Sequence, residues 1–245
     1  MTCSLFLRAS HLPYDEYFCS RAESETGMSG AWRGVFVLAL CASCGGSSEV
    51  RSDKHLAQTP PDHLQPEEYV AAARDYRRAC DDGTAQACGY LGFMYDNGQG
   101  VQVDVTTAVS LSTRACAEAG AYGCAYLGYL YQVGRGVPQD AARAATLYRK
   151  ACDGEDSSGC LLLGIMYKTG SGVGRDSEYA AQLFNRACDD GESLACASLG
   201  YMYANGEGVD LDVAHAQALF RTACASGDEI GCDAEAQLAR REPVP

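Results

Sequence analysis

Five pairs of cysteines recur along this sequence at a strict interval of 36 residues, with seven residues between the members of each pair. The pairs lie at positions 80/88, 116/124, 152/160, 188/196 and 224/232. Other positions keep this period, because YLGFMYDNGQGV at 90–101 returns as YLGYLYQVGRGV, LLGIMYKTGSGV and SLGYMYANGEGV. A fixed period without insertions is typical of repeat proteins. We therefore expect a repeat domain over 66–241, with a half unit at each end. Its full units are 87–122, 123–158, 159–194 and 195–230.

Each unit is predicted to form two helices. In the first unit, Cys88, Leu91, Gly92 and Tyr95 fall at i, i+3, i+4 and i+7, which places them on one helical face. Gly98 is expected to end this helix, because glycine tolerates the left-handed backbone of a C-terminal cap. An aspartate then begins the second helix, where its carboxylate can accept hydrogen bonds from free amides. These aspartates are Asp104, Asp140, Asp176 and Asp212.

A single helical hairpin of 36 residues cannot bury its own apolar face, whereas stacked copies can. The sequence therefore predicts an all-α fold, a right-handed α/α superhelical solenoid. The half unit at 66–82 is expected to be a lone second helix. The half unit at 229–241 is expected to be a lone first helix, and both would act as caps.

The periodic cysteines allow three interpretations. Zinc sites favour two to four residues between paired ligands, and no histidines accompany these cysteines in register. Free thiols would behave as small apolar side chains in the core. Disulfides require an oxidising compartment, and fourteen cysteines is a high count for a cytosolic chain. We favour disulfides.

Two disulfide pairings compete, because Cys116 would lie near both Cys88 and Cys124. Chain entropy separates the two by only about 1 kcal/mol. Pairing Cys88 with Cys116, and so on along the chain, would leave Cys80 and Cys232 without partners. We therefore predict the pairs 80–88, 116–124, 152–160, 188–196 and 224–232, each joining one repeat to the next.

The pattern LGxxYxxGxGVxxDxxxA resembles the Sel-one-like repeat, a relative of the tetratricopeptide repeat. The added AC-x7-C at a 36-residue period resembles the cysteine-rich, secreted bacterial branch of that family, the Hcp type. The resemblance covers 66–241. It implies a curved superhelix whose first helices line a concave groove and whose repeats are bridged at the spacing above. It also implies a binding scaffold, although some cysteine-rich members bind penicillin-type compounds, with slow β-lactamase activity attributed to them.

Some columns of the repeat are irregular. Ser112 stands where the later units have the aromatic residues Tyr148, Phe184 and Phe220. Thr222 replaces the basic residue that the earlier units have in its column, and the loop at 153–158 shifts its glycine. At these positions the repeat pattern does not predict the local contacts, but the predicted fold is unaffected.

The segment MSGAWRGVFVLALCASCGGSSE at 28–49 resembles a bacterial lipoprotein signal, with a short apolar core before the cysteines. We expect 28–43 to be the signal peptide and Cys44 to carry the lipid, Cys41 being the other candidate. Plain secretion and a short buried helix are the alternatives. The apolar stretch is too short to span a bilayer. Residues 1–27 fit poorly as part of a signal, so we expect translation to begin at Met28. Residues 44–65 are expected to form a disordered tether, and 242–245 a short tail.

By analogy with tetratricopeptide geometry, one surface of the first helices faces the groove. Aromatic and apolar side chains flanked by amides on this surface suit an extended peptide. The alternative is that the rings only fill space between helices. The predicted groove residues are Tyr90, Phe93, Asn97, Tyr126, Tyr129, Leu162, Ile165, Tyr201 and Asn205.

No catalytic constellation can be assigned from the sequence. The KTG at 168–170 resembles a β-lactamase motif, but it occupies the helix end that DNG, QVG and ANG occupy in the other units. No Ser-x-x-Lys accompanies it, and His215 is isolated on its predicted helix. We therefore predict no metal, no cofactor and no catalytic residues. A net charge of −13 without basic runs argues against nucleic acid as a partner.

The favoured function is a monomeric, non-catalytic scaffold, lipid-anchored in the bacterial cell envelope or secreted, that binds a protein or peptide. Its contact with a membrane would be through the lipid alone. The alternative is a penicillin-binding protein with slow β-lactamase activity, whose ligand would be a β-lactam or a cell-wall-derived small molecule. Enzymatic activity is left open between these two hypotheses.

Overall fold

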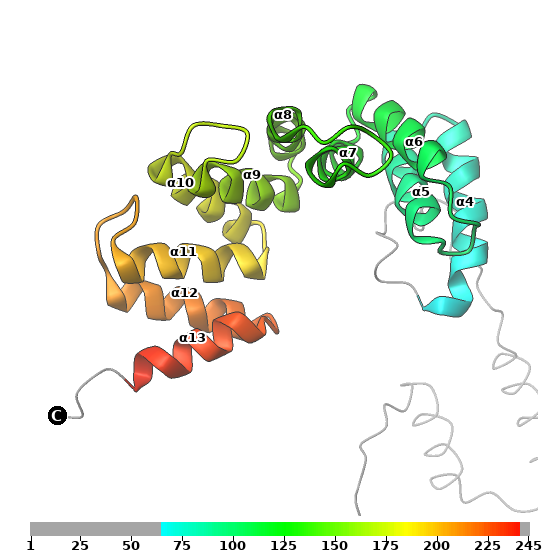
Figure 1. The fold of residues 1–245 in the computed structure, drawn as a ribbon. Helices are drawn as coiled ribbons and strands as arrows, with labels where there is room; N and C mark the ends of the chain where they lie inside the picture. The colour runs from blue at the N-terminus through cyan, green and yellow to red at the C-terminus, as the bar shows by residue number, and fades with distance from the viewer. Residues whose placement is uncertain (1–64, 241–245) are drawn as a thin grey trace, which may run out of the picture. The chain divides into compact units, whose positions relative to one another are not determined.

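The computed structural model describes residues 65–240, in which ten α-helices follow a short 3-10 helix, η2 (Pro66–Glu68) (Figure 1). The α-helices are α4 (Tyr69–Asp81), α5 (Ala85–Asn97), α6 (Val105–Ala117), α7 (Ala121–Val133), α8 (Ala141–Asp153), α9 (Ser157–Thr169), α10 (Ser177–Asp189), α11 (Ser193–Asn205), α12 (Val213–Ala225) and α13 (Glu229–Ala239). Each helix packs against the next along the chain. The predicted helical repeat solenoid is confirmed for this part of the chain.

The two helices of each repeat begin and end where the sequence predicts. Asp104 caps α6, because its carboxylate accepts a hydrogen bond from the amide of Thr107 at 3.1 Å. The aspartates that precede α8, α10 and α12 make the same bond. Gly98 ends α5 with a left-handed φ of 69°, and the corresponding glycines end α7, α9 and α11 in the same way.

The second glycine of each GxG motif has a different role. A Cβ atom at Gly100 would lie 2.2 Å from the carbonyl oxygen of Tyr69 at the start of α4. Gly172 and Gly208 approach the starts of α8 and α10 equally closely. The motif therefore allows the turn of one repeat to touch the second helix of the repeat before it.

The core of the hairpins is a ring packed over a glycine. Phe184 is fully buried, and a Cβ atom at Gly164 would lie 2.7 Å from its ring. Tyr148 over Gly128 and Phe220 over Gly200 repeat this contact. In these three repeats the close approach of the two helices thus depends on a glycine in the first helix and a ring in the second, whereas Gly92 of the first repeat faces Ser112.

Five disulfides join the repeats within residues 65–240. They link Cys80 to Cys88, Cys116 to Cys124, Cys152 to Cys160, Cys188 to Cys196 and Cys224 to Cys232. Each connects the end of a second helix to the following first helix, so the solenoid is stapled at every repeat boundary. Five disulfides in one chain indicate an oxidising, extracytoplasmic compartment.

The two ends of the repeat array are half units, because α4 has no first helix before it among the described residues and α13 is not followed by a second helix there. No helix in the described part of the chain is long and apolar enough to cross a membrane. The predicted upstream extension, signal peptide, lipidated Cys44, tether and C-terminal tail lie outside the described residues, apart from Gln65.

Candidate functional site

A hollow of about 300 Å³ lies between the first helices of three successive repeats, α5, α7 and α9. The repeats bring these helices together, since α5 contacts α7 and α7 contacts α9. We call this site the inner hollow. Its lining residues are Phe93, Asp96, Asn97, Tyr122, Ala125, Tyr126, Tyr129, Arg135, Asp156, Ser158 and Leu162.

The wall of the inner hollow is aromatic. The rings of Phe93 and Tyr126 meet edge to face with centroids 5.4 Å apart. Tyr126 stacks between Tyr122 and Tyr129, at 6.3 and 6.0 Å. Tyr129 keeps 42% of its surface exposed, so its ring is available to a ligand.

Phe93 packs differently from its counterpart in a later repeat. There, Tyr201 of α11 packs on Phe220 of its own second helix, with centroids 4.9 Å apart. Phe93 occupies the column of Tyr201, but Ser112 in α6 offers it no ring. Phe93 packs against Tyr122 and Tyr126 of α7, the next first helix. The aromatic cluster therefore joins α5 to α7.

A buried carboxylate holds the floor of the hollow. Asp96 is only 3% exposed and accepts hydrogen bonds of 2.5 Å from both the Tyr126 hydroxyl and Nε of Arg135. Arg135 also donates through Nη2 to the main-chain carbonyl of Asp96 at 2.8 Å. Burial, and then the hydrogen bond to Asp96, raise the pKa of Tyr126 well above its usual range. The same carboxylate raises the pKa of Arg135, so its guanidinium stays charged.

The opposite rim of the hollow is acidic. Asp156 caps α9 by accepting a hydrogen bond of 2.7 Å from the amide of Gly159. Burial raises the pKa of Asp156, the Gly159 hydrogen bond opposes this shift, and the negative charge of Glu192 adds to it. The hydroxyl of Ser158 donates to Glu192 at 3.3 Å. Asp156 thus places a carboxylate in the hollow, and the charge of Glu192 outside its lining acts on Asp156.

The inner hollow contains five of the predicted groove residues: Phe93, Asn97, Tyr126, Tyr129 and Leu162. Tyr90 is not among its lining residues, and its side chain is buried against Tyr76 and Tyr122. Ile165, Tyr201 and Asn205 also lie outside the hollow.

Sequence reasoning missed the charged residues of the hollow, Asp96, Arg135 and Asp156. The signal for Asp96 was its position in a first helix, two residues before the terminal glycine, where the next repeat can cover it. The signal for Asp156 was its position directly before α9, where the counterparts in the two preceding repeats are Thr84 and Gly120.

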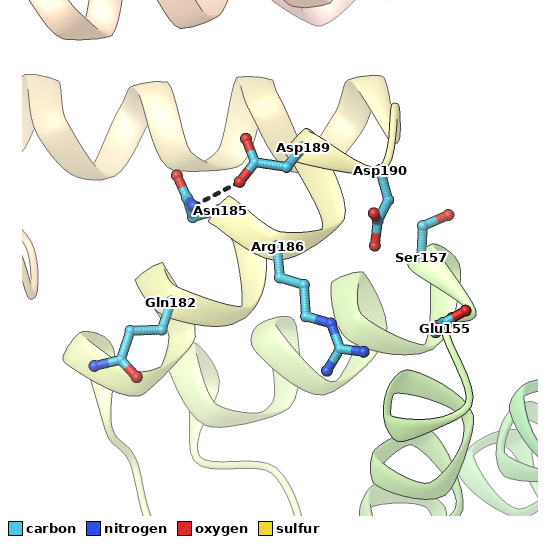
Figure 2. Close-up of a pocket in the computed structure, with 7 residues that line it drawn as sticks. All are labelled: Glu155, Ser157, Gln182, Asn185, Arg186, Asp189 and Asp190. Atoms are coloured by element: carbon cyan, nitrogen blue, oxygen red, sulfur yellow. Dashed lines mark hydrogen bonds between the residues drawn. The ribbon is translucent and has the colours of Figure 1, made fainter.

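A second, polar hollow of about 730 Å³ lies between the start of α9 and α10 (Figure 2). It has no aromatic ring, and Asn185 donates to Asp189 across its edge at 3.0 Å. Arg186 extends into it, unlike Arg114, which donates to the carbonyl of Cys80 in the preceding repeat at 2.8 Å. The lining residues are Glu155, Ser157, Gln182, Asn185, Arg186, Asp189 and Asp190. Its mixed charges and open form give no defined chemistry. Within residues 65–240, no group of side chains has the composition of a metal site.

Comparison with known proteins agrees with this architecture. The model of the Sel1 repeat matches four consecutive segments, residues 85–119, 121–156, 157–192 and 193–228. The crystal structure of a Sel1 repeat protein from Oxalobacter formigenes aligns with a TM-score of 0.63 and 25% identity, over 69% of this chain and 67% of that chain.

Two further relatives share only part of their length with this chain. The structure of c5321, described as a protective antigen of uropathogenic Escherichia coli with an SLR fold, aligns with a TM-score of 0.64 and 29% identity, over 82% of this chain and 43% of that chain. A protein of Helicobacter pylori (strain J99) named "Putative beta-lactamase HcpE" is 44% identical over 36 residues, or 15% of this chain. That match spans only 10% of HcpE.

Proposed function

Because the chain belongs to the Sel1 repeat family, we propose that it is a non-catalytic scaffold that binds a peptide or protein segment in the inner hollow. Sel1 repeat proteins generally mediate protein interactions, and stacked repeats present extended binding surfaces. The observation that carries the proposal is the exposed ring of Tyr129 beside Phe93 and Tyr126. Exposed aromatic residues are the side chains most enriched among the dominant contacts of protein interfaces.

The competing interpretation is that these rings serve packing alone, and Tyr129→Ala separates the two. The ligands are peptides enriched from a random display library on the oxidised protein. A ring used for binding leaves thermal stability nearly unchanged on truncation and weakens peptide binding at least about tenfold. A packing ring instead costs about 3 kcal/mol of folding free energy.

Tyr201→Ala is the matched control, because Tyr201 holds the same column and a similar exposure outside the inner hollow. Its loss is expected to leave peptide binding unchanged. A large loss of stability in Tyr129→Ala, or equal loss of binding in the two variants, would overturn the assignment of the hollow.

The cellular location proposed with this function is the bacterial cell envelope, where the protein is anchored through a lipid on Cys44. The lipoprotein-like segment at 28–49 and the oxidised state of the periodic cysteines support it. Metabolic labelling with a palmitate analogue is expected to mark the wild-type protein and not Cys44→Ala. Label that persists in this variant would move the anchor to Cys41.

β-Lactam hydrolysis is the second candidate, and the name of HcpE is the observation that favours it. Turnover of nitrocefin by the purified, oxidised protein tests it. A rate that copurifies with the protein and falls in Tyr129→Ala would favour hydrolysis in the inner hollow. A rate that is independent of every substitution there would indicate a contaminant.

A further inference from the structure

The inner hollow combines two features that recognise cations. The first is the exposed ring of Tyr129, which stacks on the buried ring of Tyr126 with centroids 6.0 Å apart. The negative face of an aromatic ring attracts an ammonium or guanidinium group within about 6 Å of its centroid. The hydroxyl of Tyr126 donates to the carboxylate of Asp96, which increases the electron density of the ring and strengthens this attraction.

The second feature is an uncompensated negative charge beside the rings. Arg135 lines the same hollow, but its guanidinium is committed to Asp96, so that pair is neutral. Asp156 and Glu192 form no ion pair with any described residue, and they lie close enough to repel one another. A cation between Asp156 and the ring of Tyr129 would relieve this repulsion, since both residues line the hollow.

Elsewhere, this chain already places its own arginines on tyrosines. The guanidinium carbon of Arg143 lies 4.3 Å from the centroid of the Tyr131 ring, and Arg77 and Arg149 lie 5.8 Å from the rings of Tyr95 and Tyr167. These contacts join second helices to first helices, and none of their residues lines the inner hollow. Among the described residues, no arginine or lysine lies over the ring of Tyr126 or Tyr129. A cation on these rings would therefore have to come from a ligand.

We propose that the inner hollow is a subsite for the side chain of a lysine or arginine in the bound peptide, held between the exposed ring of Tyr129 and the carboxylate of Asp156. The inference rests on the proposed function, since it names the chemistry of the partner for the same hollow. The net charge of −13 on the whole chain also attracts a positively charged peptide.

The direct test uses two small probes that differ only in charge, N-acetyl-arginine amide and N-acetyl-citrulline amide. Aromatic resonances of the oxidised protein are followed by NMR at probe concentrations up to about 10 mM, where weak binding is measurable. The arginine probe is expected to shift the resonances of Tyr126 and Tyr129, and the citrulline probe is not. Equal shifts from both probes, or no shift from either, would overturn the subsite.

Asp156→Asn tests the role of the carboxylate, because asparagine retains the cap of α9 while losing the charge. The arginine probe is expected to bind about threefold more weakly to this variant, with a reduced dependence on salt. Asp228→Asn is the matched control, since Asp228 caps α13 through Gly231 at 2.9 Å in the same column of a later repeat. Equal effects of the two substitutions would contradict a local role for Asp156.

Library peptides distinguish failure of the subsite from failure of the proposed function. If peptides bind in a manner that depends on Tyr129 but tolerates replacement of every lysine and arginine, the hollow binds peptides and the cation subsite is wrong. If the arginine probe shifts Tyr129 while no library peptide depends on Tyr129, the subsite stands and the peptide-binding function fails.

Discussion

Asp96 and Arg135 form an ion pair between successive repeats, and Lys168 and Glu207 repeat that pair two units later with the charges exchanged. Each pair joins residues that are 39 positions apart. Asp96 and Lys168 occupy one column of the repeat, and Arg135 and Glu207 occupy another. Asp96 is buried, whereas the Lys168–Glu207 pair is longer, at 3.7 Å, and more exposed. The two ion pairs therefore occupy equivalent positions of the repeat, but only the first contains a buried carboxylate.

Removing Arg135 is expected to destabilise the protein more than removing Lys168. Arg135→Gln would leave the Asp96 carboxylate buried without its counter-ion, at a cost of about 3 kcal/mol. Lys168→Gln affects an exposed pair worth less than about 1 kcal/mol. Urea denaturation of the oxidised proteins measures both. If adding Asp96→Asn to Arg135→Gln restores stability, the cost comes from the uncompensated charge of Asp96. Equal stabilities of Arg135→Gln and Lys168→Gln would contradict the special cost of burying the Asp96 carboxylate.

The turns between repeats contain two residues whose backbone favours glycine. Ala119 and Glu155 have φ of 65°, in the column where Gly83, Gly191 and Gly227 also have positive φ. Replacing Glu155 by glycine is expected to raise the free energy of unfolding by about 1 kcal/mol, because a side chain is disfavoured in this conformation. Gly191→Ala is expected to lower it by a similar amount, since open space around Gly191 leaves backbone strain as the only cost. Equal thermal midpoints of these two variants would contradict a preference for glycine in this column.

The stability difference between the wild type and Asp156→Asn is expected to depend on pH. Burial raises the pKa of Asp156 in the folded state above its ordinary value of 3.8. A raised carboxyl pKa means that stability is lost as pH rises from the unfolded pKa through the folded pKa. Asp156→Asn should therefore be the more stable protein near neutral pH, and the advantage should vanish in acid. An advantage that persists below the ordinary pKa would show that the charge is not its cause.

Ser112→Ala is expected to leave the fold intact and to raise its stability by about 1 kcal/mol. The Ser112 hydroxyl is fully buried and has no hydrogen-bond partner among the described residues. Removing an unsatisfied buried hydroxyl relieves its desolvation cost. Denaturant titration provides the measurement, with Ser110→Ala as an exposed control in the same helix. A clear loss of stability in Ser112→Ala would mean that the hydroxyl has a partner in solution.

The sequence predicted the fold because its strongest signals are local and repeat. Asp104 and Gly98 determine helix ends through bonds within a few residues, and the cysteine period requires every unit to pack alike. The position of the inner hollow could not be predicted, because it depends on exceptions to the repeat. Phe93 packs on Tyr126, and Asp96 accepts hydrogen bonds from Tyr126 and Arg135. Both are contacts between units.

The disulfides also determine how the solenoid would respond to a pulling force. Each bridge closes a separation of eight residues, so those residues cannot lengthen when a repeat is unravelled from its ends. A reduced repeat of 36 residues could extend to about 120 Å, whereas an oxidised repeat would reach about 95 Å. Every bridge lies between two repeats, so tension would be carried across each boundary by a covalent bond even after the neighbouring helices had separated. The maximum length of the stretched repeat domain would therefore be shorter in its oxidised form than in its reduced form.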